Sequence, residues 1–375
     1  MKKLLALLLC LAVVFSFSAC GGDTTTGGDG GDTPQVVSFD DIDDNCESED
    51  GTYQIAMVTD VGLLKDGSFN QFTWNGCKMY AYENGKTYKY YQPANGSNAT
   101  DDDRIKAMTD ACEAGAEAIV APGFLQATAL AEVAPKYPDV QFVFIDGWDT
   151  GLENVIGVSY QEEQAGYLAG YATVMDGYTK LGYSGGGGGS NPACNKYGYG
   201  FCQGANAAAA EKGINVEMRY SWEYGSQFSA SDDLQAMLAG WYNAGTEVIF
   251  VCGGTMSNSG FAAAEAADGK IVGVDVDQSG LSETVITSAT KGLAQSVELS
   301  LADFYANGLR SGSKVYGAAD DAVGIPTDPW TLQNWTVDDF NALFEKVKNG
   351  EVTIDNNADV NDPSTAGLAN MTFIN

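Results

Sequence analysis

The chain has 375 residues, of which 45% are hydrophobic, and its 50 acidic and 19 basic residues give a formal net charge of -31. This length and composition allow one large or two medium domains with real cores, and the negative charge argues against binding nucleic acid or lying flat on an anionic membrane. The sequence contains no histidine, which excludes histidine-based catalytic triads, histidine general bases and imidazole metal sites.

The first segment with a recognisable pattern is residues 1–20, which read MKKLLALLLCLAVVFSFSAC. Two lysines precede an apolar run that is short for a membrane span, and small residues precede Cys20. The segment resembles a bacterial lipoprotein signal peptide, and this resemblance implies that Cys20 carries acyl chains such as palmitate. We therefore expect a lipid anchor on the extracellular face of the cell membrane; an uncleaved anchor helix and an ordinary signal peptide are the alternatives.

The next segment is rich in Gly, Asp and Thr, because residues 21–34 read GGDTTTGGDGGDTP and an acidic stretch follows. Such residues cannot bury enough apolar surface to offset the entropy of ordering. Residues 21–50 are predicted to be a flexible acidic linker, and the folded part is predicted to begin near Thr52. Cysteines outside residues 1–20 show no CxxC spacing, so we expect no metal site and no cofactor. Cys194 and Cys202 could form a disulfide, or could be buried as small hydrophobic residues.

Beyond residue 52, short apolar runs alternate with helical patterns. A strand is predicted for each of six runs, at residues 53–59, 118–121, 141–145, 247–251, 270–274 and 283–287. Helical spacing of large apolar residues predicts helices near residues 71–84 and 231–244. Nearly continuous apolar strands are typical of parallel sheets covered on both faces, so the fold class is predicted to be α/β with doubly wound parallel sheets.

A sequence pattern that occurs twice divides the chain into two parts. Residues 111–120 (ACEAGAEAIV) and residues 243–250 (NAGTEVIF) each contain an Ala-Gly helix end followed directly by a strand. Two similar lobes whose strands end in glycine loops predict a ligand cleft at the carboxyl ends of the strands. The spacing alone fits a binding protein and a two-domain enzyme equally well.

Several motifs in order resemble one known family. Residues 55–62 read IAMVTDVG, residues 65–71 read KDGSFNQ and residues 74–76 read WNG, and further matches follow to about residue 305. This pattern resembles the basic membrane protein (BMP) family, which includes bacterial purine nucleoside receptor lipoproteins. The resemblance implies a type I periplasmic-binding-protein fold with two doubly wound parallel-sheet lobes and a hinge. The lobe boundaries expected from it are residues 51–150 with 284–318 for the N-terminal lobe, and residues 151–283 with 319–375 for the C-terminal lobe.

The resemblance also implies a function. The chain would be the solute-binding protein of an ABC importer. As a monomer, it would bind a nucleoside, expected to be a purine nucleoside, between its lobes and deliver it to permease and ATPase subunits. By the family pattern, Phe69 stacks on the base, Asp275 binds the sugar hydroxyls and Tyr197 supplies the opposite aromatic face. A base stacked on an aromatic ring typically contributes about 1–3 kcal/mol.

The remaining candidate site residues follow strands or turns, and each has a structural alternative. Asp60 and Asp146 end strands, where a carboxylate can accept from ribose hydroxyls or simply form the turn. Asn70 can read a base edge or cap the following helix. Gly253 permits close approach of the backbone to a ligand or forms a tight turn. Lys291 follows a strand expected to return to the N-terminal lobe, and would bond ribose, pair with Asp60 or Asp146, or lie in solvent.

Three other functions remain open at this point. The same fold could bind a sugar or another small polar solute, or the protein could be a surface sensor that does not import. A hydrolase using Asp60 and Asp146 as a carboxylate pair is the alternative from another class. Because the sequence offers no activated nucleophile, and its five-glycine run at residues 185–189 lacks the Gly-Lys-Ser/Thr of a phosphate loop, we expect no enzyme activity.

Overall fold

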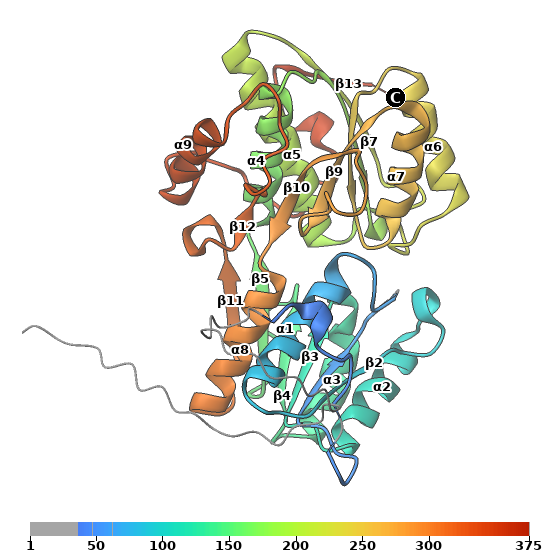
Figure 1. The fold of residues 1–375 in the computed structure, drawn as a ribbon, viewed down its shortest axis with the longest axis vertical. Helices are drawn as coiled ribbons and strands as arrows, with labels where there is room; N and C mark the ends of the chain where they lie inside the picture. Colours follow the sequence, from blue (N-terminus) through green and yellow to red (C-terminus); the bar gives the residue numbers. More distant parts are fainter. Residues whose placement is uncertain (1–36, 47, 62, 375) are drawn as a thin grey trace, which may run out of the picture. The chain divides into compact units, whose positions relative to one another are not determined.

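The computed structural model describes residues 37–46, 48–61 and 63–374, and residues 38–375 form one compact unit. This unit contains two sheets (Figure 1). The first sheet is entirely parallel, with the order β11 (Gly312–Tyr316), β5 (Val155–Tyr160), β4 (Gln141–Ile145), β3 (Ala118–Pro122), β1 (Ile55–Val58) and β2 (Tyr88–Tyr91). The second has the order β12 (Val323–Gly324), β10 (Val285–Lys291), β9 (Lys270–Asp275), β8 (Val248–Cys252), β6 (Lys180–Gly185), β7 (Val216–Ser221) and β13 (Met371–Phe373), and only β12 is antiparallel to its neighbour.

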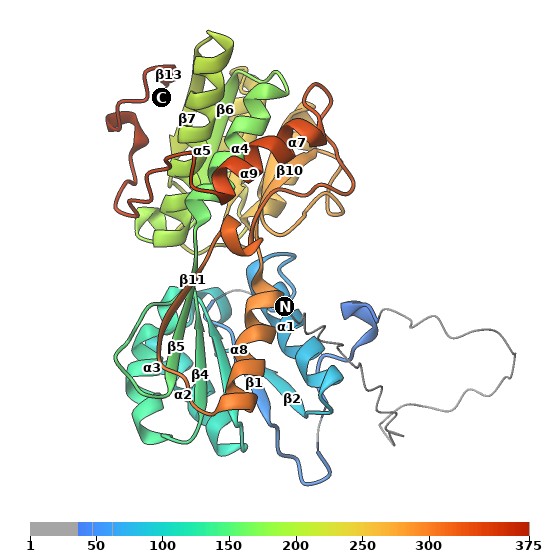
Figure 2. The same ribbon diagram turned by 90° about the vertical axis from the view of Figure 1, so that its left-hand side faces the viewer.

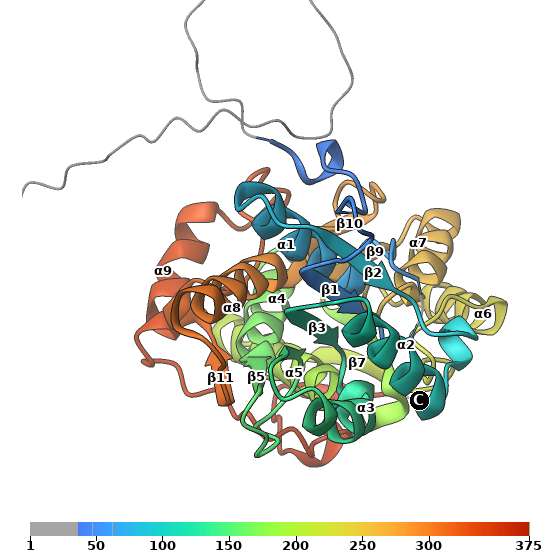
Figure 3. The ribbon, with the colours of Figure 1, turned by 90° about the horizontal axis from the view of Figure 1, so that it is seen from below.

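Helices cover each sheet and complete two lobes. The first lobe carries α1 (Phe69–Glu83), α2 (Asp101–Glu113), α3 (Ala127–Val133) and α8 (Leu293–Asn307). Figure 3 shows α1 and α8 side by side on one side of the first sheet, and α2 and α3 on the other. The second lobe carries α4 (Glu162–Met175), α5 (Pro192–Lys212), α6 (Asp232–Asn243), α7 (Met256–Ala267) and α9 (Val337–Lys348). This arrangement confirms the predicted α/β class with two parallel-sheet lobes.

The central strands are apolar along their whole length because helices pack on both of their faces. Every residue of β1, β3, β4 and β8 is buried. In the first lobe, side chains from α2 and α3 join those of the strands in one core that includes Met108, Leu130 and Phe144. In the second lobe, Leu234 and Leu238 of α6 lie one helical turn apart and are both fully buried. The periodicity in the sequence therefore reports burial correctly.

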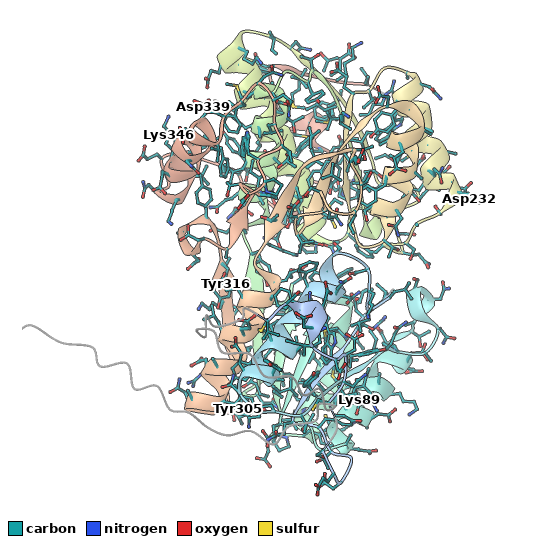
Figure 4. All side chains as sticks on the ribbon, in the orientation of Figure 1. Lys89, Asp232, Tyr305, Tyr316, Asp339 and Lys346 are labelled. Carbon is teal, nitrogen blue, oxygen red and sulfur yellow. The ribbon has the colours of Figure 1, made fainter. Side chains whose placement is uncertain are left out.

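The chain crosses between the lobes at three points within residues 63–374 (Figure 2). The first crossing follows β5, the second follows β10, and the third follows β11, which ends at Tyr316, labelled in Figure 4. The lobe boundaries predicted from the sequence are wrong for two strands. β5 belongs to the first sheet, although residues 151–283 were assigned to the C-terminal lobe, and β10 belongs to the second sheet, although residues 284–318 were assigned to the N-terminal lobe. An apolar run predicts a strand but not the strand with which it pairs.

The linker prediction is also wrong for its last part. Residues 38–46 contain a short 3-10 helix (Phe39–Asp41), and Ile42 is 5% exposed. Cys46 pairs with Tyr88 of β2. The folded part therefore begins at about residue 38 rather than near Thr52. Residues 1–36, which include Cys20 and most of the predicted linker, lie outside the described residues.

Glycines allow α4 and α5 to pack closely. A Cβ atom on Gly170 of α4 would lie 2.1 Å from the carbonyl oxygen of Phe201, and one on Gly204 of α5 would lie 1.9 Å from that of Tyr167. Contacts this short leave no room for a methyl group. The close approach fixes α5, which carries Tyr197, against the middle of α4.

This packing leads to a prediction for Gly170→Ala. The added methyl group must push α5 away, and overpacking of this kind typically lowers the free energy of unfolding by about 1–3 kcal/mol. Gly240→Ala in α6 is the matched control, because nothing lies within 4 Å of the new Cβ atom, and it should stabilise by about 0.5–1 kcal/mol. Urea denaturation followed by circular dichroism measures both. Equal effects of the two substitutions would show that the helix contact does not limit stability.

Candidate functional site

A cavity lies where strands of both sheets end, and the space between its lining atoms, open solvent included, is about 620 Å³. Its walls come from the carboxyl ends of β1, β4, β8, β9 and β10, and from the beginnings of α1 and α5. The eight side chains or backbone positions predicted from the sequence all line it: Asp60, Phe69, Asn70, Asp146, Tyr197, Gly253, Asp275 and Lys291. The geometry thus brings the predicted set together, as expected for strand ends that meet at one edge of a parallel sheet.

Lys291 is the centre of the polar part of the cavity. Its Nζ atom lies 2.8 and 2.7 Å from the two carboxylate oxygens of Asp146, and 3.7 Å from Oδ1 of Asp275. The side chain is only 2% exposed. Burial by itself lowers the pKa of Lys291, but the surrounding carboxylates outweigh burial and hold this pKa above its ordinary value. Lys291 is therefore a buried cation paired with Asp146, one of its two predicted partners, and not a lysine in solvent.

Carboxylates outnumber cations around Lys291. Glu162, at the start of α4, lies 3.6 Å from Nζ of Lys291 and also pairs with Lys196 of α5. Burial raises the pKa of Asp146 to about 6, against the opposing effect of Lys291, and burial also raises the pKa of Asp275. The surplus of acceptor oxygens favours a ligand that donates hydrogen bonds and disfavours an anionic one.

Asp146 and Asp275 share an unusual backbone conformation. Their φ angles are +55° and +67°, in the left-handed region that aspartate tolerates better than most residues. Each aspartate directly follows or ends a central strand, so the left-handed turn redirects the chain at the sheet edge. The two roles considered for Asp146 are therefore compatible. Its backbone forms the turn, and its carboxylate lines the cavity.

Asp60 lies at the end of β1 in a second carboxylate position. Its Oδ1 accepts from the backbone N–H of Val61 at 2.6 Å. A Cβ atom on Gly123 would lie 1.8 Å from Oδ2 of Asp60, so only glycine leaves room for this carboxylate. Burial raises the pKa of Asp60 to about 7. Near neutral pH the group can consequently act as an acceptor or, when protonated, as a donor.

The beginning of α1 places Phe69 and Asn70 in the cavity wall. Asp66 caps this helix, because its carboxylate accepts from the backbone N–H groups of Ser68 and Asn70 at 2.9 and 3.0 Å. The alternative role of Asn70 as the helix cap is therefore wrong. Its Nδ2 atom donates to the carbonyl of Val61 at 3.1 Å, and its buried Oδ1 atom has no hydrogen-bond partner among the described residues. This oxygen is available to accept from a ligand.

Three aromatic rings line the cavity, and the sequence identified two of them. Phe69 lies with its ring centroid 4.9 Å from Nζ of Lys291, and Tyr197 lies with its centroid 5.7 Å from the same atom. Phe228 is the ring that sequence reasoning missed. It has a φ of +54° on the loop between β7 and α6, and no periodicity marks such a position.

The glycines of the second lobe make room for Phe228. A Cβ atom on Gly186 would lie 2.4 Å from its ring, and one on Gly253 would lie 3.1 Å from it. Gly186 and Gly187 of the five-glycine run therefore lie against an aromatic ring, which is a reason for glycine unrelated to phosphate binding. The glycines at residues 185–189 and 253–254 could have indicated that a bulky side chain packs against them. They could not have identified that side chain.

Hydrogen bonds join the lobes around the cavity. The Ser68 hydroxyl donates to Oδ2 of Asp275 at 2.6 Å, and the Gln278 side chain donates to the carbonyl of Gly67 at 3.2 Å. The hydroxyl oxygens of Ser97 and Ser229 are 2.8 Å apart. These contacts, together with Lys291 and Asp146, hold the two sheet edges together over the cavity.

The cysteines of α5 are not joined to each other. Cys194 lines the cavity, and both it and Cys202 are buried free thiols on α5, so the two do not form the disulfide considered above. Over the ranges that the structure describes, no group of three or more carboxylates or thiols is arranged to hold a metal ion. No helix within those ranges has both the length and the apolar character needed to cross a membrane.

Comparisons with known proteins agree with this geometry. A family model described as "ABC transporter substrate-binding protein PnrA-like" matches residues 53–358. A CD4+ T-cell-stimulating antigen of Listeria monocytogenes is 26% identical over 80% of this chain and 88% of its own length. The ABC transporter nucleoside-binding protein BmpA of Lactococcus lactis is 26% identical over 60% of this chain and 64% of its own. A solved ABC transporter solute-binding protein of Aeropyrum pernix aligns over 84% of this chain and 97% of its own, with a TM-score of 0.71 and 19% identity, and confirms the predicted type I periplasmic-binding-protein fold.

Proposed function

Because the chain belongs to the Bmp family of PnrA-like ABC transporter substrate-binding proteins, we propose that it binds a nucleoside in the cavity between its lobes. The observation that carries this proposal is the combination of buried surplus carboxylates with aromatic rings in one cavity. A nucleoside needs both, because its ribose donates hydroxyl hydrogens and its base offers a flat face. The Lactococcus lactis relative, whose name describes it as nucleoside-binding, supports the same ligand class.

The ribose would be held by the aspartates around Lys291. Oδ2 of Asp275 already accepts from Ser68 at 2.6 Å, but Oδ1 lies 3.7 Å from Lys291, beyond hydrogen-bonding distance. This oxygen is therefore free to accept a hydroxyl hydrogen from the ligand. Hydrogen bonds to a charged carboxylate are stronger than those between neutral groups, so the sugar hydroxyls would supply much of the binding energy.

The base would lie against Phe69, with Tyr197 or Phe228 as a further aromatic wall. Asn70 Oδ1 can accept an N–H from the base edge, and Asp60 can donate or accept according to its protonation. Pairing of a buried donor or acceptor with a ligand group avoids leaving it unsatisfied when the cavity is closed. We therefore propose that Asp60 and Asn70 read the base and that Gly253 allows the backbone to approach it.

The proposed cellular role follows from the family. The chain would deliver its ligand to permease and ATPase subunits, and would itself carry out no catalysis. We further propose that it acts as a monomer tethered through acylated Cys20 at the extracellular face of the membrane; Cys20 lies outside the described residues. Mass spectrometry of the mature protein for a diacylglyceryl group on Cys20 tests the anchor.

A ligand screen tests the proposed specificity. We expect a nucleoside to raise the melting temperature of the purified protein, and the corresponding free base to do so weakly, because only the nucleoside engages Asp146 and Asp275. Calorimetric titration of the same compounds gives the affinities. If only sugars or amino acids stabilise the protein, the nucleoside proposal is wrong and a receptor for another polar solute replaces it.

A further inference from the structure

Residues 38–46, called here the N-terminal strap, pack along the first lobe. Backbone hydrogen bonds of 2.9 and 3.0 Å join Cys46 to Tyr88 on the edge strand β2, and the Tyr88 hydroxyl donates to the carbonyl of Asp43 at 2.8 Å. Ile42 is buried, and the ring of Phe39 packs edge-on against Phe72 of α1. The strap thus contacts both the sheet edge and the helix that carries Phe69 and Asn70.

A buried lysine fixes the strap to α1. Lys78 is only 4% exposed, and its Nζ atom donates to the carbonyls of Phe39 and Ile42 at 3.0 and 3.1 Å and to Oδ1 of Asp44 at 3.3 Å. An ammonium group has three hydrogens, and here all three have acceptors in the strap. A buried cation is tolerated only when it is paired and hydrogen-bonded in this way. The strap and Lys78 therefore depend on each other.

The strap also contacts the segment that leads into the cavity. Oδ2 of Asp44 pairs with Lys65 at 2.8 Å. The next residue is Asp66, which lines the cavity and whose carboxylate accepts from the backbone N–H groups at the start of α1. A continuous set of contacts thus runs from Lys78 through Asp44 and Lys65 to the backbone that places Phe69 and Asn70.

We propose that the N-terminal strap is a positioning element of the ligand site, with Lys78 as its anchor and Asp44 as its link to the cavity wall. The predicted effect of the strap on nucleoside affinity rests on the function proposed above. The predicted ordering of residues 63–71 by the strap does not depend on that function.

The experiment compares three variants of the full mature chain. Lys78→Met removes the anchor, Asp44→Asn weakens the link to Lys65, and Lys106→Met is the control, because Lys106 is an exposed lysine of the same lobe paired with Asp110. Hydrogen–deuterium exchange is measured on residues 38–46, 63–71 and 270–291, without and with a nucleoside. Calorimetry measures nucleoside affinity.

We expect Lys78→Met to speed exchange in residues 38–46 and 63–71 but not in residues 270–291. We also expect it to weaken nucleoside binding about tenfold, because α1 then holds Phe69 and Asn70 less firmly. Asp44→Asn should speed exchange in residues 63–71 with a smaller loss of affinity, and Lys106→Met should change neither. Faster exchange confined to residues 38–46, with 63–71 unchanged in both variants, would overturn the proposal. If the unmodified protein binds no nucleoside, the proposed function fails while the exchange data still decide the role of the strap.

Discussion

Replacing Lys291 with methionine is expected to lower the free energy of unfolding at pH 8 by about 3–5 kcal/mol, the cost typical of removing one partner of a buried ion pair. The side chain is buried and lies within 4 Å of carboxylate oxygens of Asp146, Asp275 and Glu162. Methionine fills similar space but provides no charge. Asp146 and Asp275 would then remain as buried carboxylates without their cation.

The loss should depend on pH in a defined direction. The pKa of Asp146 is already raised by burial to about 6 in the presence of Lys291, and removal of the cation must raise it further. The folded variant then binds protons that the unfolded chain, with carboxyl pKa values near 4, has released. Stability therefore falls as pH rises from about 4 through values above 6, and the variant should lose less at pH 5 than at pH 8.

Urea denaturation at pH 5 and pH 8 measures this difference. Lys136→Met is the control, because Lys136 pairs with Glu132 on the surface, where such pairs contribute at most about 1 kcal/mol. An equal loss at both pH values, or a loss no larger than that of the control, would contradict the assignment of Lys291 as the cation that neutralises the cavity.

Asp275→Ala is expected to have the largest effect on ligand binding. If Asp275 accepts from ribose hydroxyls, removing its carboxylate costs charge-assisted hydrogen bonds of about 1.5–3 kcal/mol each, so that two such bonds correspond to a loss of affinity of at least about 100-fold. Isothermal titration calorimetry with the best nucleoside from the screen measures it. Lys291 keeps Asp146 as its partner in this variant, which should preserve the fold.

Asp277→Ala provides the comparison for Asp275→Ala. Asp277 lies two residues further along the chain, is exposed, and accepts from the backbone N–H of Ser279 at 2.9 Å. It should leave affinity nearly unchanged. Similar affinities of the two variants would show that the carboxylate of Asp275 does not bind the ligand, and the nucleoside model would need another sugar-binding group.

The sequence allowed the cavity to be predicted better than the connections between the lobes. Asp60 and Asp146 follow strands of the first sheet, and Asp275 ends a strand of the second. Local patterns place each carboxylate at the carboxyl edge of its own sheet, and the two-lobed fold implied by the family resemblance places these edges opposite each other. The sheet to which β5 or β10 belongs depends instead on pairing with distant residues, such as β11 for β5, and no local pattern encodes such a pairing.

The role of Phe228 and the structure of residues 38–46 could not be predicted from the sequence for a related reason. Phe228 reaches the cavity from a loop because glycines elsewhere leave space for its ring. The acidic composition of residues 38–46 favours disorder, but three acceptors in this segment match one buried lysine 34 to 39 positions away. Composition averages over such a specific match, so it could not predict the strap.

The contacts between Gly67 and Gln278 and between Ser97 and Ser229 join the lobes through protein groups alone. Each bond formed only when the lobes meet raises the equilibrium population of the shut state, whatever solute is present. A solute then has to supply less free energy to close the lobes. The gain in affinity is the same for weakly and for tightly bound compounds. These contacts at the rim thus raise the affinity for every solute by the same factor and leave the ratio of affinities between solutes unchanged.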